Sequence, residues 1–153
     1  MNKLICREFT PGRRFMGRLP HGKDIIGLIE NFCKENSVQT ATFSLIGAVS
    51  AATLGAYDQK QLVYVTFKET AALEILSCTG NISLKEGSPF VHAHIVLGDE
   101  QGKVIGGHLF SETLIFAGEI EIRELTGPRL ERAYDPITGL ALWTPADPSD
   151  FRL

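Results

Sequence analysis

Two apolar stretches that carry histidines decide the fold: PFVHAHIVL at residues 89–97 and KVIGGH at residues 103–108. The segment between them, GDEQG at residues 98–102, is rich in glycine and in acidic or amide residues. Such a segment between two apolar runs is typical of a hairpin turn. We therefore predict two antiparallel strands joined by a five-residue turn.

The pairing of this hairpin predicts where its histidines lie. Without a bulge, His92 lies directly opposite His108. His94 then lies opposite Gly106, and the glycine leaves space there. Side chains on a strand alternate between the two faces of a sheet, so all three histidines share one face. Directly opposed residues have Cβ atoms about 4.5–5.5 Å apart. We expect the three to converge on one patch, unless a bulge at Gly106-Gly107 turns His108 to the other face.

Three imidazoles on one face are the ligand set of a divalent metal with an open coordination position. Zinc takes imidazole nitrogens at about 2.0–2.1 Å, and a three-histidine site keeps a fourth position for water or a ligand. Nickel, copper and iron also accept imidazole, so zinc is the expected ion without being the only one that fits. The alternative is that the histidines form ordinary hydrogen bonds within the sheet.

Composition indicates one globular domain. The 153 residues are 44% hydrophobic and 22% charged, which is typical of a soluble protein with its own core. No apolar run reaches the ~18 residues of a membrane helix, and the N-terminal residues do not resemble a secretory signal. The three cysteines have no CxxC spacing, so we expect them to be reduced, in a cytoplasmic protein. A net charge of −3 gives no general attraction to nucleic acid.

The remaining pattern predicts one helix and a series of strands. Apolar residues recur with a helical period from Asp24 to about Lys34. Strands are predicted at residues 3–9, 13–19, 41–49, 52–57, 62–67, 73–78, 82–84 and 114–124, with short elements at 130–134 and 140–143. This succession predicts an α+β fold, a mainly antiparallel β-sheet with one principal α-helix. We expect residues 1–144 to form a single domain and residues 145–153 to form a loose tail.

Three further residues are candidates for contact with the metal or a ligand. Glu119 and Glu121 alternate with isoleucines in the last long strand. This alternation is typical of a half-buried strand whose charged face meets solvent, and the alternative is that either carboxylate reaches the metal or a bound ligand. His21 precedes the helix in a loop, where exposure to solvent is expected.

Arginines suggest a second kind of site. Arg13, Arg14 and Arg18 lie on one predicted strand, either as a solvated edge or as a contact for an anion, DNA or another subunit. Together with Arg129 and Arg132, they would form the basic surface that a DNA-binding protein needs.

The chain resembles the plants-and-prokaryotes-conserved (PPC) domain family over roughly residues 3–144. The segments that carry the resemblance are Gly17–Gly22, Ile46–Val49, Leu54–Tyr57, Leu73–Ile82, Pro89–His94 and Gly106–Leu109. The sequence has no Arg-Gly-Arg-Pro core of an AT-hook, so it is similar to the stand-alone bacterial type. The resemblance implies an α+β homotrimer with a metal at His92, His94 and His108. Members of the family are commonly labelled as DNA-binding.

Four functions follow from these observations. The first is a trimeric metal-binding domain that binds a small ligand, and the second is a DNA-binding regulator. The third is a metal-dependent enzyme such as a hydrolase, in which Glu119 or Glu121 serves as base for a metal-bound water. The fourth is a trimerisation module in which the histidines only pack. We favour the trimeric metal-binding domain, with DNA-binding or regulation as its functional label. The chain has no nucleotide-binding loop or Gly-x-Ser-x-Gly motif.

Overall fold

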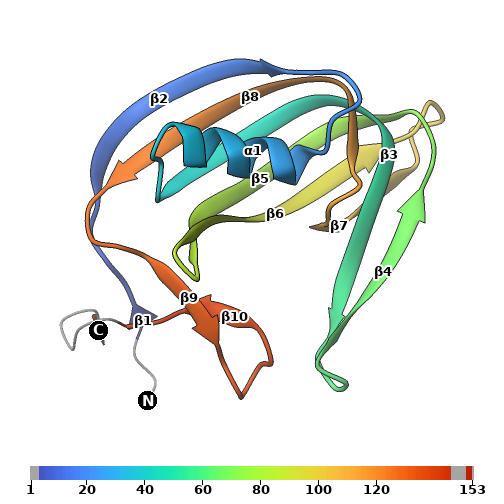
Figure 1. Ribbon diagram of the computed structural model, residues 1–153. Helices are drawn as coiled ribbons and strands as arrows, with labels where there is room; N and C mark the ends of the chain where they lie inside the picture. The colour runs from blue at the N-terminus through green and yellow to red at the C-terminus, as the bar shows by residue number, and fades with distance from the viewer. Residues whose placement is uncertain (1–3, 146–150, 153) are drawn as a thin grey trace.

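A strongly curved, mainly antiparallel sheet with one helix against a face makes up the fold (Figure 1). The computed structural model describes residues 4–145 and 151–152. Its elements are β1 (Leu4–Ile5), β2 (Thr10–Leu19), α1 (Ile25–Glu35), β3 (Ala41–Asp58), β4 (Val63–Glu69), β5 (Leu73–Lys85), β6 (Ser88–Gly98), β7 (Val104–Leu109), β8 (Leu114–Thr126), β9 (Glu131–Tyr134), β10 (Ala141–Trp143) and β11 (Phe151–Arg152). The predicted α+β class with a mainly antiparallel sheet is confirmed.

Strand β3 organises the sheet. The main sheet has the order β10-β9-β5-β6-β7-β3-β8-β2, with β4 paired to β3 as well. The first half of β3 pairs with β5 and β8, and its second half pairs with β4 and β7. Because β5 also pairs with β6, and β6 with β7, the strands β3, β5, β6 and β7 close into a ring. The histidine hairpin β6–β7 is therefore part of this ring and is held on both sides.

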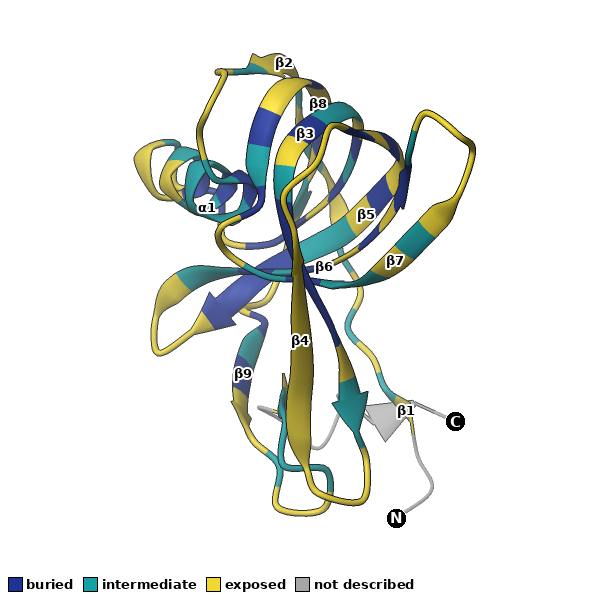
Figure 2. Ribbon diagram, turned by 90° about the vertical axis from the view of Figure 1, so that its right-hand side faces the viewer, coloured by how far each residue is buried: buried dark blue, intermediate teal, exposed yellow. Residues whose placement is uncertain are grey.

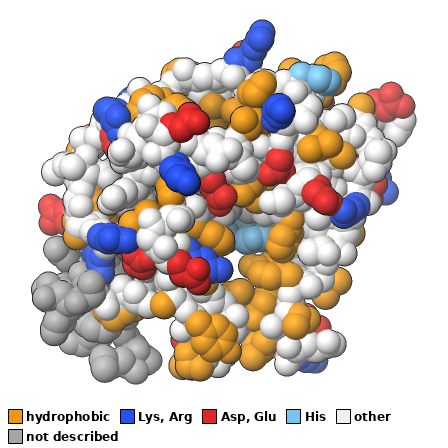
Figure 3. Space-filling model, viewed as in Figure 1, with side chains coloured by type: hydrophobic (Ala, Val, Ile, Leu, Met, Phe, Trp, Pro, Cys, Tyr) orange, Lys and Arg blue, Asp and Glu red, His pale blue; other side chains and the backbone are white. Residues whose placement is uncertain are grey.

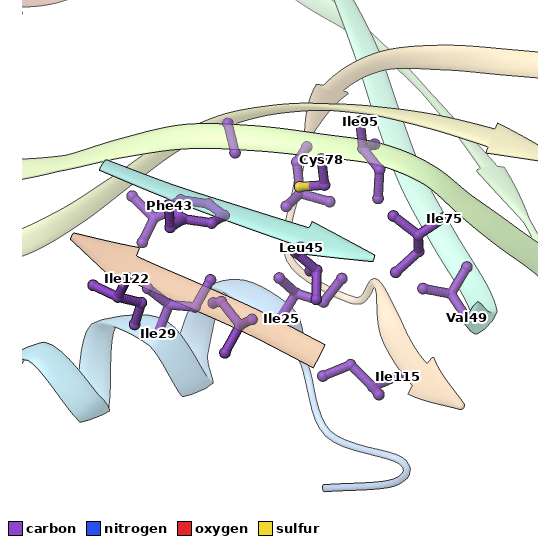
Figure 4. Packing of buried hydrophobic residues seen from close by; sticks show 14 of the residues in the cluster. Ile25, Ile29, Phe43, Leu45, Val49, Ile75, Cys78, Ile95, Ile115 and Ile122 are labelled. Carbon is purple, nitrogen blue, oxygen red and sulfur yellow. The ribbon is translucent and has the colours of Figure 1, made fainter. Parts of the chain in front are cut away.

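Helix α1 covers one face of the sheet and confirms the predicted helix to within one residue at each end. The Asp24 carboxylate caps its first turn and accepts a hydrogen bond from the Gly27 N–H at 2.9 Å. Ile25, Ile29 and Cys33 then follow at helical spacing and are buried. They pack in the main core against side chains such as those of Phe43, Leu45 and Ile122 (Figure 4). Among the described residues, no helix has the length and apolar character that crossing a membrane requires.

Two of the strands are longer than predicted, because the predicted interruptions at residues 50–51 and 79–81 do not occur. Residues 41–58 form one strand, β3, and residues 73–85 form another, β5. Gly47 has φ +140° at an irregularity in the pairing of β3, and a Cβ there would collide with the Ala117 carbonyl oxygen. Such a glycine lets the strand bend without ending.

The chain ends differ from the prediction in length. The expected strand 3–9 contains only β1, Leu4–Ile5, which pairs with β11, Phe151–Arg152. The expected loose tail falls mainly on residues 146–150 and 153, which lie outside the described residues. The predicted boundary of the domain at residue 144 stays a prediction.

Candidate metal centre

The register of the hairpin differs by two residues from the prediction. His94, and not His92, lies opposite His108, and the expected space across from His94 is absent because Gly106 lies opposite Val96. The turn begins one residue later, at Asp99, whose carboxylate accepts hydrogen bonds from the Gln101 and Lys103 N–H groups at 3.0 and 2.8 Å. This side-chain-stabilised turn moves the register.

The predicted convergence of the histidines is nevertheless confirmed. A shift of two residues leaves every side chain on its original face, and the pairing of β6 with β7 has no irregularity. Ring centroids lie 5.3 Å apart for His92 and His94, 5.1 Å for His92 and His108, and 5.5 Å for His94 and His108. Each ring offers one nitrogen, and these three nitrogens lie within 4.8 Å of one another.

The geometry fits a metal after small side-chain rotations. Nitrogens on a tetrahedral ion at 2.0–2.1 Å are about 3.4 Å apart, so the rings need to move together by an ångström or so. His94 is exposed, while His92 and His108 are half-buried. A metal held by these three rings would therefore keep a position open toward the surface. Figure 3 shows a histidine surface near the centre of this face, beside a band of hydrophobic side chains.

Two features of the strands hold the cluster. In β6 the residues between and beside the histidines, Ala93 and Ile95, are buried in the core, so His92 and His94 point away from it. In β7, His108 lies opposite Gly55 of β3. A Cβ on Gly55 would lie 2.8 Å from the Phe110 ring and 2.9 Å from a β4 carbonyl oxygen, so only glycine permits this close approach.

Aromatic side chains surround His108. The Tyr64 hydroxyl lies 3.5 Å from His108 Nδ1, and the two ring centroids are 4.7 Å apart. The Phe110 ring centroid lies 4.8 Å from that of His108. A contact to Nδ1 leaves Nε2 of the same ring free for a metal, as is common for histidine ligands with an outer hydrogen-bond partner. Sequence reasoning missed Tyr64, since its strand β4 reaches the hairpin only through β3.

The cluster favours neutral imidazoles. Burial, and then the neighbouring histidines, lower the pKa of His108 to about 4. Burial also lowers the pKa of His92, and the positive charge of Arg132 and then His94 add to this effect. Both rings are therefore neutral at pH 7, which is the form that donates a lone pair to a metal.

The other predicted partners of the metal lie elsewhere. Glu121 faces Ser44 on β3, which in turn faces Thr79 on β5, and Thr79 faces His94. Three strand spacings of about 4.8 Å thus put Glu121 about 14 Å from His94 along the sheet. Glu119 lies two residues further along β8.

His21 is also outside the cluster. It is exposed, as expected, and its Nδ1 lies 2.9 Å from the Phe116 carbonyl oxygen. Its ring packs edge-on against the Phe116 ring, with centroids 5.5 Å apart. In this structure it contacts no member of the histidine cluster, so its predicted part in the site has no support.

The arginines do not form one open basic surface. Arg13 binds Glu124 at 2.7 Å, Arg14 lies 3.6 Å from Glu121, and Arg129 binds Glu131 at 2.8 Å. Arg18 is exposed and faces Glu119 across the strand pair. The placement of Arg132 on such a surface is wrong, because its side chain is only 7% exposed. Its guanidinium lies instead beside the histidine cluster, where sequence reasoning did not expect it.

The fold and the cluster together define a β-sheet domain with a three-histidine centre on a closed ring of strands. The model of the Plants and Prokaryotes Conserved (PCC) domain family matches residues 6–126. The chain therefore belongs to this family, the PPC domain expected from the sequence.

Solved structures with the same fold support the assignment. A metal-containing protein from Archaeoglobus fulgidus is 46% identical and has a TM-score of 0.86, over 90% of this chain and 97% of that one. A PPC protein from Pyrococcus horikoshii is 37% identical, with a TM-score of 0.88 over 94% and 99% of the two chains. A candidate DNA-binding protein from Bacteroides thetaiotaomicron is 27% identical, with a TM-score of 0.79 over 89% and 96%.

Curated relatives are much longer proteins. The bifunctional protein GlmU of Synechococcus sp. is 33% identical over 124 residues, which are 80% of this chain. This chain spans about a fifth of the length of the curated relatives that it matches, 19% and 18% for the two Synechococcus proteins. The shared region is thus one part of those proteins.

Proposed function

We propose that this protein is a metal-binding domain in which His92, His94 and His108 hold one divalent ion, with zinc as the expected metal. The observation that carries the proposal is the set of three ring nitrogens within 4.8 Å of one another. Three imidazoles on one hairpin are a ligand set that zinc accepts readily. The metal-containing relative from Archaeoglobus fulgidus, at 46% identity, supports the same reading.

Ligand binding fits this centre better than hydrolysis. Hydrolysis by a metal-bound water usually needs a base within hydrogen-bond reach. Among the described residues, the group of potential metal ligands contains histidines only, and Glu121 lies several strands away. Burial raises the pKa of Tyr64, whose hydroxyl lies 3.5 Å from His108 Nδ1, so this hydroxyl stays protonated at neutral pH. We therefore assign the open metal position to binding a small ligand.

A role in DNA binding has weaker support. The chain carries a net charge of −3, and Arg13, Arg14 and Arg129 each lie close to a glutamate. A duplex binds chiefly through cations that are free to meet phosphates. The regulatory label thus rests on relatives such as the candidate DNA-binding protein from Bacteroides thetaiotaomicron, and detectable DNA binding at low salt is the measurement that would support it.

We further propose that the protein forms the homotrimer that its family resemblance implies. Strand β4 supports assembly, because it projects from the sheet with β3 and is exposed along its whole length (Figures 1 and 2). Its apolar side chains Val63, Val65 and Phe67 are 47%, 60% and 42% exposed. A large exposed apolar surface of this kind is typical of an interface. Sedimentation should give about three times the chain mass of 16.8 kDa, and a monomer would contradict the proposal.

The free cysteines indicate the cellular compartment of the protein. Cys33 and Cys78 are buried and Cys6 is exposed, and all three are free. Free thiols are usual in the reducing cytoplasm, so we propose that compartment.

Metal analysis tests the proposed centre directly. Protein prepared without an affinity tag should contain about one metal per chain by elemental mass spectrometry. His92→Ala and His108→Ala should each lose it, while His21→Ala, the variant at the remaining histidine, should keep it. Circular dichroism verifies that each variant is folded. Equal metal content in all four proteins would refute the assigned ligands, and no metal in any after incubation with Zn²⁺ would refute the centre.

A further inference from the structure

A hollow of about 270 Å³ lies directly beside the histidine cluster. His92 and His108 form one part of its wall, and Arg132 and Lys85 form another. Aromatic and aliphatic side chains, including those of Phe90 and of Leu142 in β10, line the rest. Two of the three clustered histidines and a buried arginine thus line one space, although His92 and Arg132 are far apart in the sequence.

Hydrogen bonds hold the Arg132 guanidinium in this space and leave some of its N–H groups unused. Its Nε donates to Ser83 Oγ at 2.9 Å, Nη1 donates to the Ala141 carbonyl oxygen at 3.1 Å, and Nη2 donates to Asn81 Oδ1 at 2.8 Å. A guanidinium has five N–H groups, so two remain. Every one of these acceptors is neutral. Among the described residues, no carboxylate forms an ion pair with Arg132.

Two rings fix the orientation of the guanidinium. Its central carbon lies 5.1 Å from the Trp143 ring and 5.6 Å from the Phe90 ring. Trp143 is itself fixed, since its indole N–H donates to Ser83 Oγ at 3.1 Å. Lys85 places its ammonium 5.3 Å from the same Phe90 ring. The arginine is therefore preorganised, which reduces the entropy that a bound partner would have to offset.

The charge in this hollow is uncompensated. Arginine keeps its proton at any physiological pH, and burying a charge without a counter-charge is costly. No aspartate or glutamate lines the hollow among the described residues. A divalent metal on three neutral imidazoles would keep its full charge of two and add it to that of Arg132. The matching occupant is an anion.

We propose that this hollow binds a small carboxylate, which bridges the open metal position and the guanidinium of Arg132. This inference rests on the proposed metal centre and names the ligand class of that centre. A carboxylate suits the planar fork of arginine and also binds a metal through one oxygen. The apolar wall around Phe90, Phe110 and Leu142 would cover an aromatic or aliphatic body. The volume lies below the roughly 300–1,000 Å³ of pockets for drug-sized molecules, so the ligand is small.

Benzoate is a suitable probe because it joins a carboxylate to a compact apolar ring. The protein is loaded with Co²⁺, whose visible absorption reports a change in its ligands, and is titrated with benzoate. Calorimetry gives the affinity in parallel. We expect benzoate to change the spectrum and to bind measurably. Arg132→Lys keeps the charge but loses the fork, and we expect at least a tenfold weaker affinity for benzoate with unchanged uptake of Co²⁺.

Two further variants keep the test decisive. Arg129→Ala removes an arginine that pairs with Glu131 outside the hollow, and it should bind benzoate as the unchanged protein does. Leu142→Trp, at a side chain 39% exposed, should fill the hollow and block benzoate while Co²⁺ still binds. This variant serves even if Arg132→Lys does not fold.

The other possible results refute either the carboxylate site or the metal centre. If Co²⁺ binds but benzoate changes neither spectrum nor heat, or if Arg132→Lys binds benzoate undiminished, the carboxylate site is refuted and the metal centre stands. Tighter binding of inorganic phosphate than of benzoate would refute the carboxylate class. If the unchanged protein takes up no Co²⁺ or Zn²⁺, both the metal centre and the proposed binding of a carboxylate between the metal and Arg132 are refuted.

Discussion

Replacing Gly80 by alanine tests how tightly the ring of strands supports the histidines. Gly80 lies in β5, opposite Phe43 on one side and Ala93 on the other. An added Cβ would lie 2.5 Å from the His92 carbonyl oxygen, 2.6 Å from Phe43 Cε1 and 2.8 Å from Ala93 Cβ. All three distances are shorter than real Cβ contacts allow. Phe43 is only 2% exposed, so its ring has no free space into which to move.

The expected cost follows from these contacts. Overfilling a packed core costs about 1–3 kcal/mol, and glycine to alanine returns about 0.4–1 kcal/mol by restricting the unfolded chain. Three contacts below 3.0 Å put the cost above the middle of its range, so the net loss of stability is about 1–2 kcal/mol. For a domain of this size, each kcal/mol moves the melting temperature by about 2–4 °C. We expect Gly80→Ala to melt about 2–8 °C lower than the unchanged protein.

Thermal unfolding followed by circular dichroism, at one protein concentration and without added metal, measures the effect. Gly17→Ala in β2 is the matched control, because the nearest atom to its added Cβ is Ile120 Cγ2 at an ordinary 3.9 Å. The control should remain within about 0.5 kcal/mol of the unchanged protein. Because the clash in Gly80→Ala also displaces the His92 backbone, Co²⁺ should bind this variant more weakly. A melting temperature equal to that of Gly17→Ala would refute the packing argument.

Three further predictions concern the metal, the thiols and a surface ion pair. Zn²⁺ at about 100 times its Kd should stabilise the fold by about 2.7 kcal/mol. That raises the melting temperature by about 5–11 °C, and replacement of any one cluster histidine by alanine should abolish the rise. Thiol labelling of the native protein at neutral pH should modify the exposed Cys6 alone, because burial raises the pKa of Cys33 and of Cys78 to about 12. Three labels per chain, found by mass spectrometry without denaturant, would contradict this prediction. Arg13→Ala should be less stable than the unchanged protein at neutral pH, since hydrogen bonds from Arg13 hold the pKa of Glu124 below its usual range. Urea titrations should show the difference vanishing as the pH falls through that lowered pKa, and a difference that persisted in acid would exclude the ion pair as its cause.

The histidine cluster was predictable because it depends only on which face of the sheet each side chain occupies. That face does not change when the pairing of the two strands shifts by an even number of residues. His92 and His94 are two residues apart on one strand, and any even shift of the hairpin leaves His108 on their face. The register itself depended on the Asp99 side chain, which moved the turn by one residue. Local patterns thus identified the histidine cluster, even though they gave the wrong cross-strand partners for His92 and His94.

The partners of the cluster were not predictable, because they arrive through long-range pairing. Arg132 reaches the hollow since β9 pairs in parallel with β5, which sets it opposite Lys85. Tyr64 arrives through the pairing of β4 with the far half of β3. In the sequence alone, Arg132 was one more basic residue beside Arg129, and nothing local distinguished a buried arginine from an exposed one.

The distribution of charge gives the final reason to expect a small ligand. Arg13, Arg14 and Arg129 lie near glutamates on the surface, where their fields largely cancel. Arg132 has no such partner among the described residues and lies beside the histidines in a hollow. A polyanion would need cations spread along an open surface, whereas this arrangement places positive charge in one small hollow. In a chain with a net charge of −3, that contrast favours a compact anion that can enter the hollow over a duplex that cannot.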